Sequence, residues 1–207
     1  MTWLIGGIVA LVLGYFGWST SRAAYESAKY RVIEVDQAFE IREYPQLKLV
    51  STPMNFSSQG NDGSFMRLFQ YISGGNSKQQ KVSMTTPVFM DPEREDSTGQ
   101  MAFVIPSQVA DEGVPEPSNQ HVNIREREAG LFAVRRFAGR VSEQSIRDQE
   151  SRLRQWLSAK GHDVAGELEV AGYDPPWMPS PLRRNEVLVR IQPQAAPSIS
   201  EPLSSQP

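Results

Sequence analysis

Short runs of hydrophobic residues, separated by polar turn residues, dominate the chain between residues 30 and 192. The runs are rich in Val, Ile and aromatic side chains, and Pro45 interrupts the series near its start. This length and composition are typical of β-strands. The strands predicted in this way cover residues 30–35, 39–44, 47–52, 81–89, 101–105, 122–126, 131–137, 168–173 and 185–191.

Two segments instead repeat their hydrophobic residues with the spacing of an α-helix. Ser64 is the expected N-terminal cap of the first, and a Gly-Gly-Asn sequence ends it by allowing left-handed backbone geometry. The second covers residues 142–160, with Ser142 as its cap and Gly161 at its end. The hydrophobic positions that define the first helix are Phe65, Leu68, Phe69 and Ile72.

The order of these elements repeats: strand, strand, helix, strand and strand occur twice along the chain. FEIREY at residues 39–44 also has a loose echo in VNIRERE at residues 122–128. An amphipathic helix must bury its hydrophobic face, so each helix is expected to cover one side of a shared core. The sequence therefore predicts an α+β fold, a distorted β-barrel built from two similar β-β-α-β-β halves.

The two ends of the chain differ from this central part. Residues 3–18 carry no charge and would extend about 24 Å as a helix, slightly less than the hydrocarbon thickness of a bilayer. Trp3 and Trp18 stand where interfacial aromatic residues are found. We expect a transmembrane anchor or signal segment, a folded domain and a Pro/Ser-rich disordered tail at residues 1–29, 30–192 and 193–207.

The anchor interpretation predicts a single-pass protein of a bacterial inner membrane, with residues 3–18 as its contact with lipid. Arg22, Lys29 and Arg31 follow the span and favour a cytoplasmic domain, but they are too few to decide between the cytoplasmic and periplasmic faces. Cleavage of a signal segment would instead leave a secreted or periplasmic domain.

The amino-acid composition excludes several classes of function. The 21 Lys and Arg residues against 24 Asp and Glu residues give a net charge of −3, so no nucleic-acid partner is expected. The chain has no cysteine, which excludes disulfides, thiolate metal ligands and a cysteine nucleophile. His121 and His162 are too few for a His-rich metal site. Since the sequence also lacks a phosphate-binding loop, a nucleophile elbow and an H-E-x-x-H pair, we do not expect an enzyme.

Four segments form a specific set when they are taken together. They are YRVIEVDQAFEIREY at residues 30–44, LFQYISGGN at 68–76, KVSMTTPVFM at 81–90 and AGYDPPWMPSPLRRNEVLVRI at 171–191. In this order they resemble the SOUL haem-binding protein family. The resemblance implies a barrel of two related halves, similar to bacterial effector-binding domains, that binds haem or a related tetrapyrrole. It implies no catalytic activity.

The resemblance also implies where the ligand binds. The haem contacts proposed for the family match positions along the first helix and in the loop after Tyr-Asp-Pro-Pro. In this chain those positions hold Asp62, Met66, Gln70, Trp177 and Met178. Basic residues that pair with haem propionates in some members are therefore absent here, and the position of a histidine suggested as an iron ligand in one branch holds Glu43.

The residues themselves support a soft apolar patch on the first helix and the later loop. The methionine thioether adapts to irregular surfaces and can ligate haem iron, so Met66 or Met178 is a candidate iron ligand. Arg183 and Arg184 are candidate partners of the propionates. Taken singly, each residue has an ordinary role: rim packing for Met66, a lid on the core for Trp177, and ion pairs for the arginines. Together they predict a tetrapyrrole carrier, buffer or sensor.

Two other functions remain open at this point. Glu186 lies on a strand expected to be buried, where a carboxylate must either meet an arginine or line a polar pocket. A pocket there would make the domain a small-molecule-binding module or a hydrolase, with Glu186 binding a cation or acting as a base of raised pKa. In the other alternative the apolar groove receives a partner peptide, and the protein is a scaffold.

Overall fold

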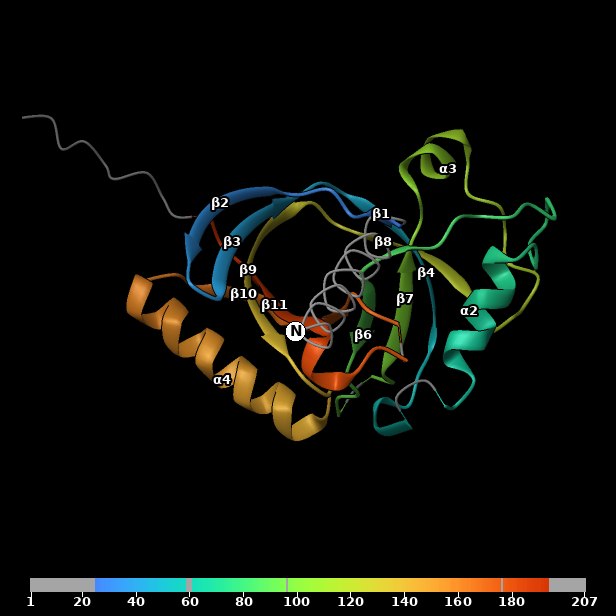
Figure 1. Cartoon of the computed structure of the whole chain (residues 1–207). Coiled ribbons are helices and arrows are strands. Elements are labelled where there is room, and N and C mark those ends of the chain that lie inside the picture. The colour runs from blue at the N-terminus through green and yellow to red at the C-terminus, as the bar shows by residue number, and fades with distance from the viewer. Residues whose placement is uncertain (1–24, 59–60, 96, 176, 194–207) are drawn as a thin grey trace, which may run out of the picture.

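Most strands of the chain form one curved sheet in the computed structural model, which describes residues 25–58, 61–95, 97–175 and 177–193 (Figure 1). The strands are β2 (Arg31–Asp36), β3 (Phe39–Tyr44), β4 (Leu47–Pro53), β6 (Val88–Asp91), β7 (Gln100–Val104), β8 (Asn123–Arg127), β9 (Gly130–Ala138), β10 (Val164–Gly172) and β11 (Arg184–Ile191). They lie in the order β2-β3-β9-β11-β10-β6-β7-β4-β8, and each neighbouring pair is antiparallel. A separate short parallel pair joins β1 (Glu26–Ser27) to β5 (Thr85–Thr86).

Two longer helices cover the outer face of this sheet. Helix α2 (Ser64–Ile72) packs against β4 and β7, and α4 (Glu143–Lys160) packs against β9, β10 and β11. Figure 1 shows them outside the curve of the sheet, on opposite sides of the molecule. The shorter helical segments are η1 (Phe56–Ser58), α3 (Ser107–Glu112) and η2 (Ser180–Leu182).

Side chains along each strand alternate between the helix side and the inner side of the sheet. On β11, Val187 and Val189 belong to the core beneath the helices, whereas Leu188 belongs to a second cluster on the inner face. Both faces of β11 are therefore buried, which explains why its sequence is nearly continuous in hydrophobic residues. The inner cluster contains Ala28, Tyr44, Leu47, Leu49, Phe89, Ala102, Val104, Phe132, Val134, Ala171 and Leu188.

Helix α4 begins and ends where the sequence predicted. Ser142 Oγ accepts a hydrogen bond from the backbone N–H of Ser145 at 3.2 Å, and Ser145 Oγ accepts one from the N–H of Ser142 at 2.9 Å. Gly161 follows the last turn in the left-handed region, with φ 71°. A backbone N–H in the first turn of a helix has no partner within the helix, so an acceptor from the cap avoids the cost of leaving that N–H unpaired.

Replacing Ser142 by alanine is expected to lower the free energy of unfolding by about 1 kcal/mol, because the first turn of α4 loses this acceptor. Urea denaturation measures the change. Ser158→Ala, at an exposed interior position of the same helix, is the control and should not destabilise the protein. Equal losses in the two variants would contradict the capping role.

The start of α2 differs from the prediction. Ser64 is the first helical residue and is buried, and Gly63 before it has a left-handed φ of 82°. The carboxylate of Asp62 accepts the backbone N–H of Ser64 at 3.0 Å and that of Asn55 at 2.7 Å. The expectation that the Ser64 side chain caps this helix was wrong, because Asp62 supplies the acceptor from two residues earlier.

The α+β class is confirmed, but the predicted barrel does not close. Within the described residues, β2 and β8 are the two edges of the nine-stranded sheet and do not pair with each other. Helix α3 also forms in a stretch where the sequence predicted neither a helix nor a strand. The similarity of the two halves stays a prediction.

The predicted localisation in a membrane needs correction. Across residues 25–58, 61–95, 97–175 and 177–193, no helix is long and apolar enough to cross a bilayer. Residues 3–18, the expected span, and all of the expected tail except Pro193 lie outside the described residues. The placement as a single-pass inner-membrane protein, or as a secreted or periplasmic product of it, is therefore withdrawn.

Candidate functional site

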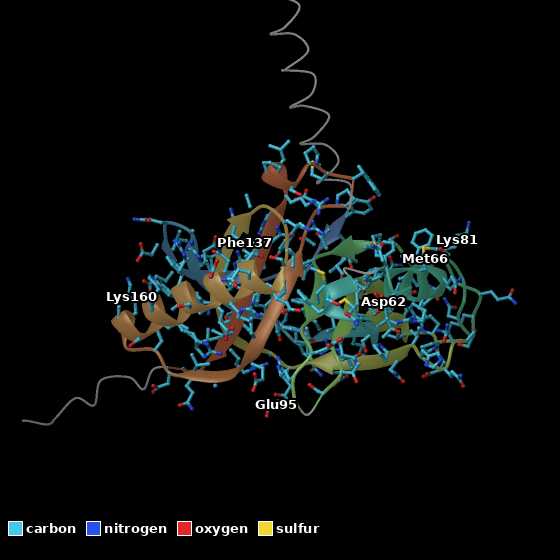
Figure 2. All side chains as sticks on the ribbon, turned by 90° about the horizontal axis from the view of Figure 1, so that it is seen from below. Asp62, Met66, Lys81, Glu95, Phe137 and Lys160 are labelled. Atoms are coloured by element: carbon cyan, nitrogen blue, oxygen red, sulfur yellow. The ribbon has the colours of Figure 1, made fainter. Side chains whose placement is uncertain are left out.

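Helix α2 presents apolar side chains to the surface at the predicted site. Met66 is 53% exposed, and Phe69 and Gln70 beside it on the helix are also exposed. Phe65 connects this surface to the core, with its ring 6.2 Å from that of Phe69 and 5.4 Å from that of Phe103. Figure 2 shows Met66 and Asp62 at the end of the molecule opposite Lys160. The exposed face of α2 is thus an apolar surface on a rigid support.

The predicted loop partners lie between β10 and β11. Trp177 is 80% exposed, whereas Met178 is half-buried. Backbone contacts hold this loop: the N–H of Met178 donates to the carbonyl of Pro175 at 3.0 Å, and Arg183 Nε donates to the carbonyl of Met178 at 2.7 Å. Arg183 is therefore already a structural donor within the loop.

The structure places the helix and the loop over different parts of the sheet. Helix α2 lies on β4 and β7, whereas η2, which follows Met178 in the loop, contacts β9. The strand order separates these supports by several strands. Both segments carry exposed apolar residues, but the described contacts do not join them into one cavity.

A buried polar cluster lies around Glu186 on the inner face of the sheet. The side chains of Glu186 and Arg42 are fully buried and form a bidentate pair, with Nη1–Oε2 at 2.7 Å and Nη2–Oε1 at 3.0 Å. Arg184 Nη2 donates to Oε1 at 2.6 Å, and Tyr173 Oη donates to Oε2 at 2.9 Å. Arg136 adds a guanidinium 3.6 Å away. Glu186 therefore meets arginines, which is one of the two outcomes that the sequence allowed.

The charges in this cluster hold Glu186 ionised. Burial alone would raise the pKa of the Glu186 carboxyl, but hydrogen bonds and charge from Arg42 and Arg184 outweigh it and lower that pKa. Burial, followed by the nearby Glu186 charge, raises the pKa of Tyr173 well above its ordinary value. A buried carboxylate of lowered pKa is a poor general base, so the geometry does not favour the hydrolase interpretation.

The Glu186 cluster makes a prediction for stability against pH. A carboxyl whose pKa is lowered by folding stabilises the protein fully above its unfolded pKa, near 4.5, and this contribution is lost as the pH falls through the folded value. Glu186→Gln is expected to lower stability at neutral pH but to flatten its decline below about pH 4.5. Urea denaturation as a function of pH tests this, and parallel curves for both proteins would contradict it.

Sequence reasoning missed Arg42, Tyr44 and Arg136, which complete this cluster. Arg42 Nη1 also donates to Tyr44 Oη at 3.1 Å, and its guanidinium lies 4.2 Å from the ring centre of Tyr30. The available signal was the alternation in FEIREY, which places residues 40, 42 and 44 on one face of β3. That pattern indicates a polar strip, but the partner strand of β3 could not be read from it.

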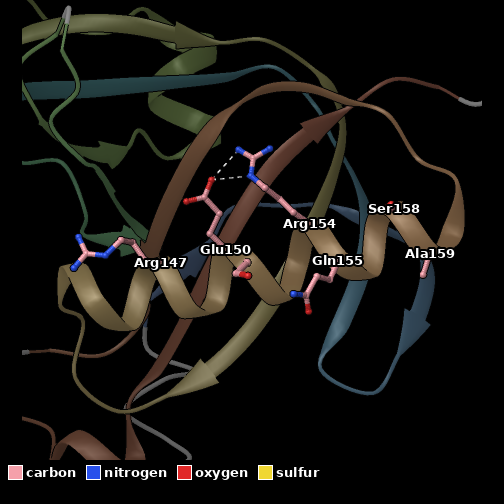
Figure 3. Close-up of a pocket in the computed structure, with 7 residues that line it drawn as sticks. Arg147, Glu150, Arg154, Gln155, Ser158 and Ala159 are labelled. Atoms are coloured by element: carbon pink, nitrogen blue, oxygen red, sulfur yellow. Dashed lines mark hydrogen bonds and ion pairs between the residues drawn. The ribbon is translucent and has the colours of Figure 1, made fainter.

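Two surface depressions lie away from all the predicted site residues. The first, of about 750 Å³, is an open area along α4 alone, where Arg154 pairs with Glu150 at 2.8 Å (Figure 3). The second, of about 420 Å³, lies where the start of α4 meets β10 and η1 and is lined mostly by charged side chains. Neither has the apolar lining that a flat macrocycle requires.

The two histidines lie in separate places. His162 follows α4 and its ring stacks on Trp156 at 6.5 Å between centres, whereas His121 is exposed before β8. Among the described residues, no group of three or more His, Asp, Glu or Cys side chains is arranged to hold a metal ion.

Comparison with known proteins identifies relatives over most of the chain. The family model described as "SOUL heme-binding protein" matches residues 25–190. "Heme-binding protein 1" of Xenopus tropicalis is 31% identical over 160 residues, which span 72% of this chain and 82% of that one. "Heme-binding protein 2" of Homo sapiens is 32% identical over 164 residues, spanning 75% and 78%. These relatives are vertebrate proteins, and the expected bacterial origin is not confirmed.

Solved structures of low sequence identity share the fold. The C-terminal domain of EcmrR has a TM-score of 0.52 at 13% identity, covering 79% of this chain and 98% of that one. A hydrolase from Listeria innocua has a TM-score of 0.53 at 12% identity, covering 76% and 93%. The expected likeness to effector-binding domains is supported at the level of fold alone.

Proposed function

Because this chain belongs to the SOUL heme-binding protein family, we propose that it binds haem on the exposed face of α2. The observation that carries this proposal is the pair of exposed apolar side chains, Met66 and Phe69, on a helix whose other face is buried. Covering such side chains removes apolar area from water, which is the main driving force for binding a macrocycle.

The chemistry of the helix face fits the ligand. Met66 offers a polarizable thioether, a group that can occupy an axial position on haem iron, and Phe69 offers an aromatic surface. Gln70 supplies an amide at the edge of the same face. Bound haem would supply its iron chemistry, while these residues would orient the ring and exclude water from one side of it.

The loop between β10 and β11 stays a proposed contact of its own, because it lies over β9 and is not joined to the face of α2. Trp177 and Met178 offer further apolar surface, and Arg183 and Arg184 are the proposed partners of the propionates. Arg184 is engaged with Glu186, and Arg183 with the carbonyl of Met178, so contact with a ligand requires these donors to be shared. The propionate interaction is therefore expected to contribute less than the apolar surface of α2.

An exposed binding face suits a carrier, buffer or sensor. A ligand held on a surface exchanges faster than one enclosed in a core, since release does not require the core to open. We propose reversible binding of haem and no reaction on it. The expectation that the chain is not an enzyme stays a prediction.

We also propose that the domain consists of two related halves. Support comes from the strand order. If β8, β9, β10 and β11 of the second half are matched to β3, β4, β6 and β7 of the first, the run β3-β9-β11-β10 corresponds to the run β8-β4-β7-β6. This match makes α2 and α4 equivalent helices. The exposed face of α4 carries Arg147, Glu150 and Arg154, so only α2 has kept an apolar outer face.

Haemin titration of the full chain, followed by the Soret band, tests the proposed function. Saturable binding with a 1:1 stoichiometry supports it, and Met66→Ala and Phe69→Ala are each expected to weaken affinity by about three- to tenfold. Ser158→Ala on α4 is the control and should leave affinity unchanged. A linear, unsaturated response in the parent chain would reject the proposal.

A further inference from the structure

Strand β2 leaves one edge of the large sheet open. Within the described part of the chain it pairs with β3 alone, so its other edge presents unpaired backbone groups. Proteins normally protect such an edge with charged side chains, because an exposed strand can pair with another chain. Here Val35 is 64% exposed, and Val32 and Ile33 are exposed as well. The strand also carries Arg31, Glu34 and Asp36, so its edge combines charged residues with three exposed apolar side chains.

A register shift decides which side chains of β2 share a face. Val32 lies opposite Arg42 and Val35 lies opposite Glu40, and both partners belong to the inner face of the sheet. In a regular strand, residues three apart point to opposite faces. The shift between Val32 and Glu34 inserts one residue and brings Val32 and Val35 to the same face.

The outer face of β2 carries a complementary pair of charges. Arg31 lies opposite Glu43 and Asp36 lies opposite Phe39, so both point to the helix side of the sheet. Arg31 pairs with Glu43 at 2.6 Å, and Asp36 accepts a hydrogen bond from Trp156 Nε1 at 2.9 Å. Lys160 Nζ also lies 3.6 Å from Asp36, so Arg31 and Asp36 are each paired within their own chain and form a cation and an anion at opposite ends of the strand, on one face.

We propose that β2 pairs in antiparallel fashion with β2 of a second copy of this chain. In this register Val32 faces the partner's Val35, Arg31 faces the partner's Asp36, and Ile33 faces the partner's Glu34 at the centre. A two-fold axis perpendicular to the sheet leaves each side chain on the same side of the sheet. Two residues that pair across the interface must therefore point to the same side. The register shift satisfies this condition for the valine pair and for the pair of Arg31 and Asp36.

The two faces of β2 contribute differently to the free energy of association. Burial of the valines and completion of the backbone hydrogen bonds supply the affinity, since cross-strand pairs of β-branched residues are favourable. The exposed charges add little affinity. The faces fix the register, because a one-residue slip would set Val32 opposite a residue of the other face. A second copy fits this edge better than an unrelated peptide, because the strand complements its own sequence.

Disulfide trapping tests the register directly, since the chain has no cysteine of its own. The variants Val32→Cys and Val35→Cys are mixed, oxidised with copper-phenanthroline and separated on a non-reducing gel. The mixture is expected to give a covalent dimer. Each variant alone should give little, because its own two cysteines would lie about 10 Å apart, beyond the reach of a disulfide. Equal products in all three samples, or none in the mixture, would overturn the proposal.

Sedimentation equilibrium of the full chain gives an independent test. Val35→Lys and Val32→Glu are each expected to weaken self-association by about tenfold, and the double variant to restore it through cross-strand Lys–Glu pairs. Each new charge lies beside an opposite charge in β3, so the variants should fold. A monomeric parent chain at all concentrations, or association that none of the variants changes, would overturn the proposal.

Discussion

Replacing Arg42 by methionine is expected to lower the free energy of unfolding by about 3–5 kcal/mol, because it leaves the carboxylate of Glu186 buried without its bidentate partner. Arg42 also donates to Glu40 at 2.7 Å and to Tyr44 at 3.1 Å, so the change disturbs a connected network. Urea denaturation with circular dichroism measures the loss.

Two variants separate this effect from a general cost of losing an arginine. Arg31→Met removes an exposed ion pair with Glu43 and is expected to change stability little. Adding Glu186→Gln to Arg42→Met is expected to recover part of the loss, because a neutral amide costs less to bury than a carboxylate that has lost its bidentate partner. Similar small losses for Arg42→Met and Arg31→Met would show that the buried pair is not a structural centre.

Met66→Glu is expected to weaken haem affinity by at least about tenfold while leaving the fold intact. The change places a carboxylate in the middle of the apolar face of α2. Bound haem would bury this carboxylate, and the haem propionates would repel it. The residue is half-exposed, so little stability depends on it. Haemin titration and urea denaturation of the same preparation separate the two effects.

Val32→Glu, opposite Arg42, is the matched control for Met66→Glu. It makes the same change of charge at an exposed apolar position on β2, away from α2. Its haem affinity should equal that of the parent chain. If both variants bind haem as the parent does, α2 does not carry the binding face.

Both long helices and most strands were predictable from local pattern, although the strand predicted at residues 81–89 is divided into β5 and β6 and β1 was not predicted. Helix α4 has its cap, its period and its terminal glycine in the sequence, and the strands have β-branched runs between turn residues. The openness of the sheet was not predictable, because closure depends on whether β2 and β8 meet, and those strands are far apart in sequence. The cap of α2 was misplaced because Asp62 acts across Gly63, a geometry that composition does not reveal.

For the candidate site too, local features were predictable from the sequence and contacts between distant residues were not. The exposure of Met66 follows from its position on the helix, beside a core face set by Leu68 and Ile72. The pairing of Glu186 with Arg42 joins residues 144 positions apart, and only the packing of β3 and β11 on either side of β9 brings them together. The sequence could state that Glu186 must meet an arginine or line a polar pocket, but it could not say which, nor which arginine it would meet.

Hydrogen exchange with and without haemin, read by mass spectrometry, tests most directly the claim that haem binds on α2. A ligand bound there suppresses local opening of the helix, so exchange at residues 64–72 should slow on saturation, while α4 at residues 143–160 should exchange as before. Slowing confined to the inner-face strands β3 and β11, with α2 unchanged, would contradict the account and place the ligand on the other side of the sheet.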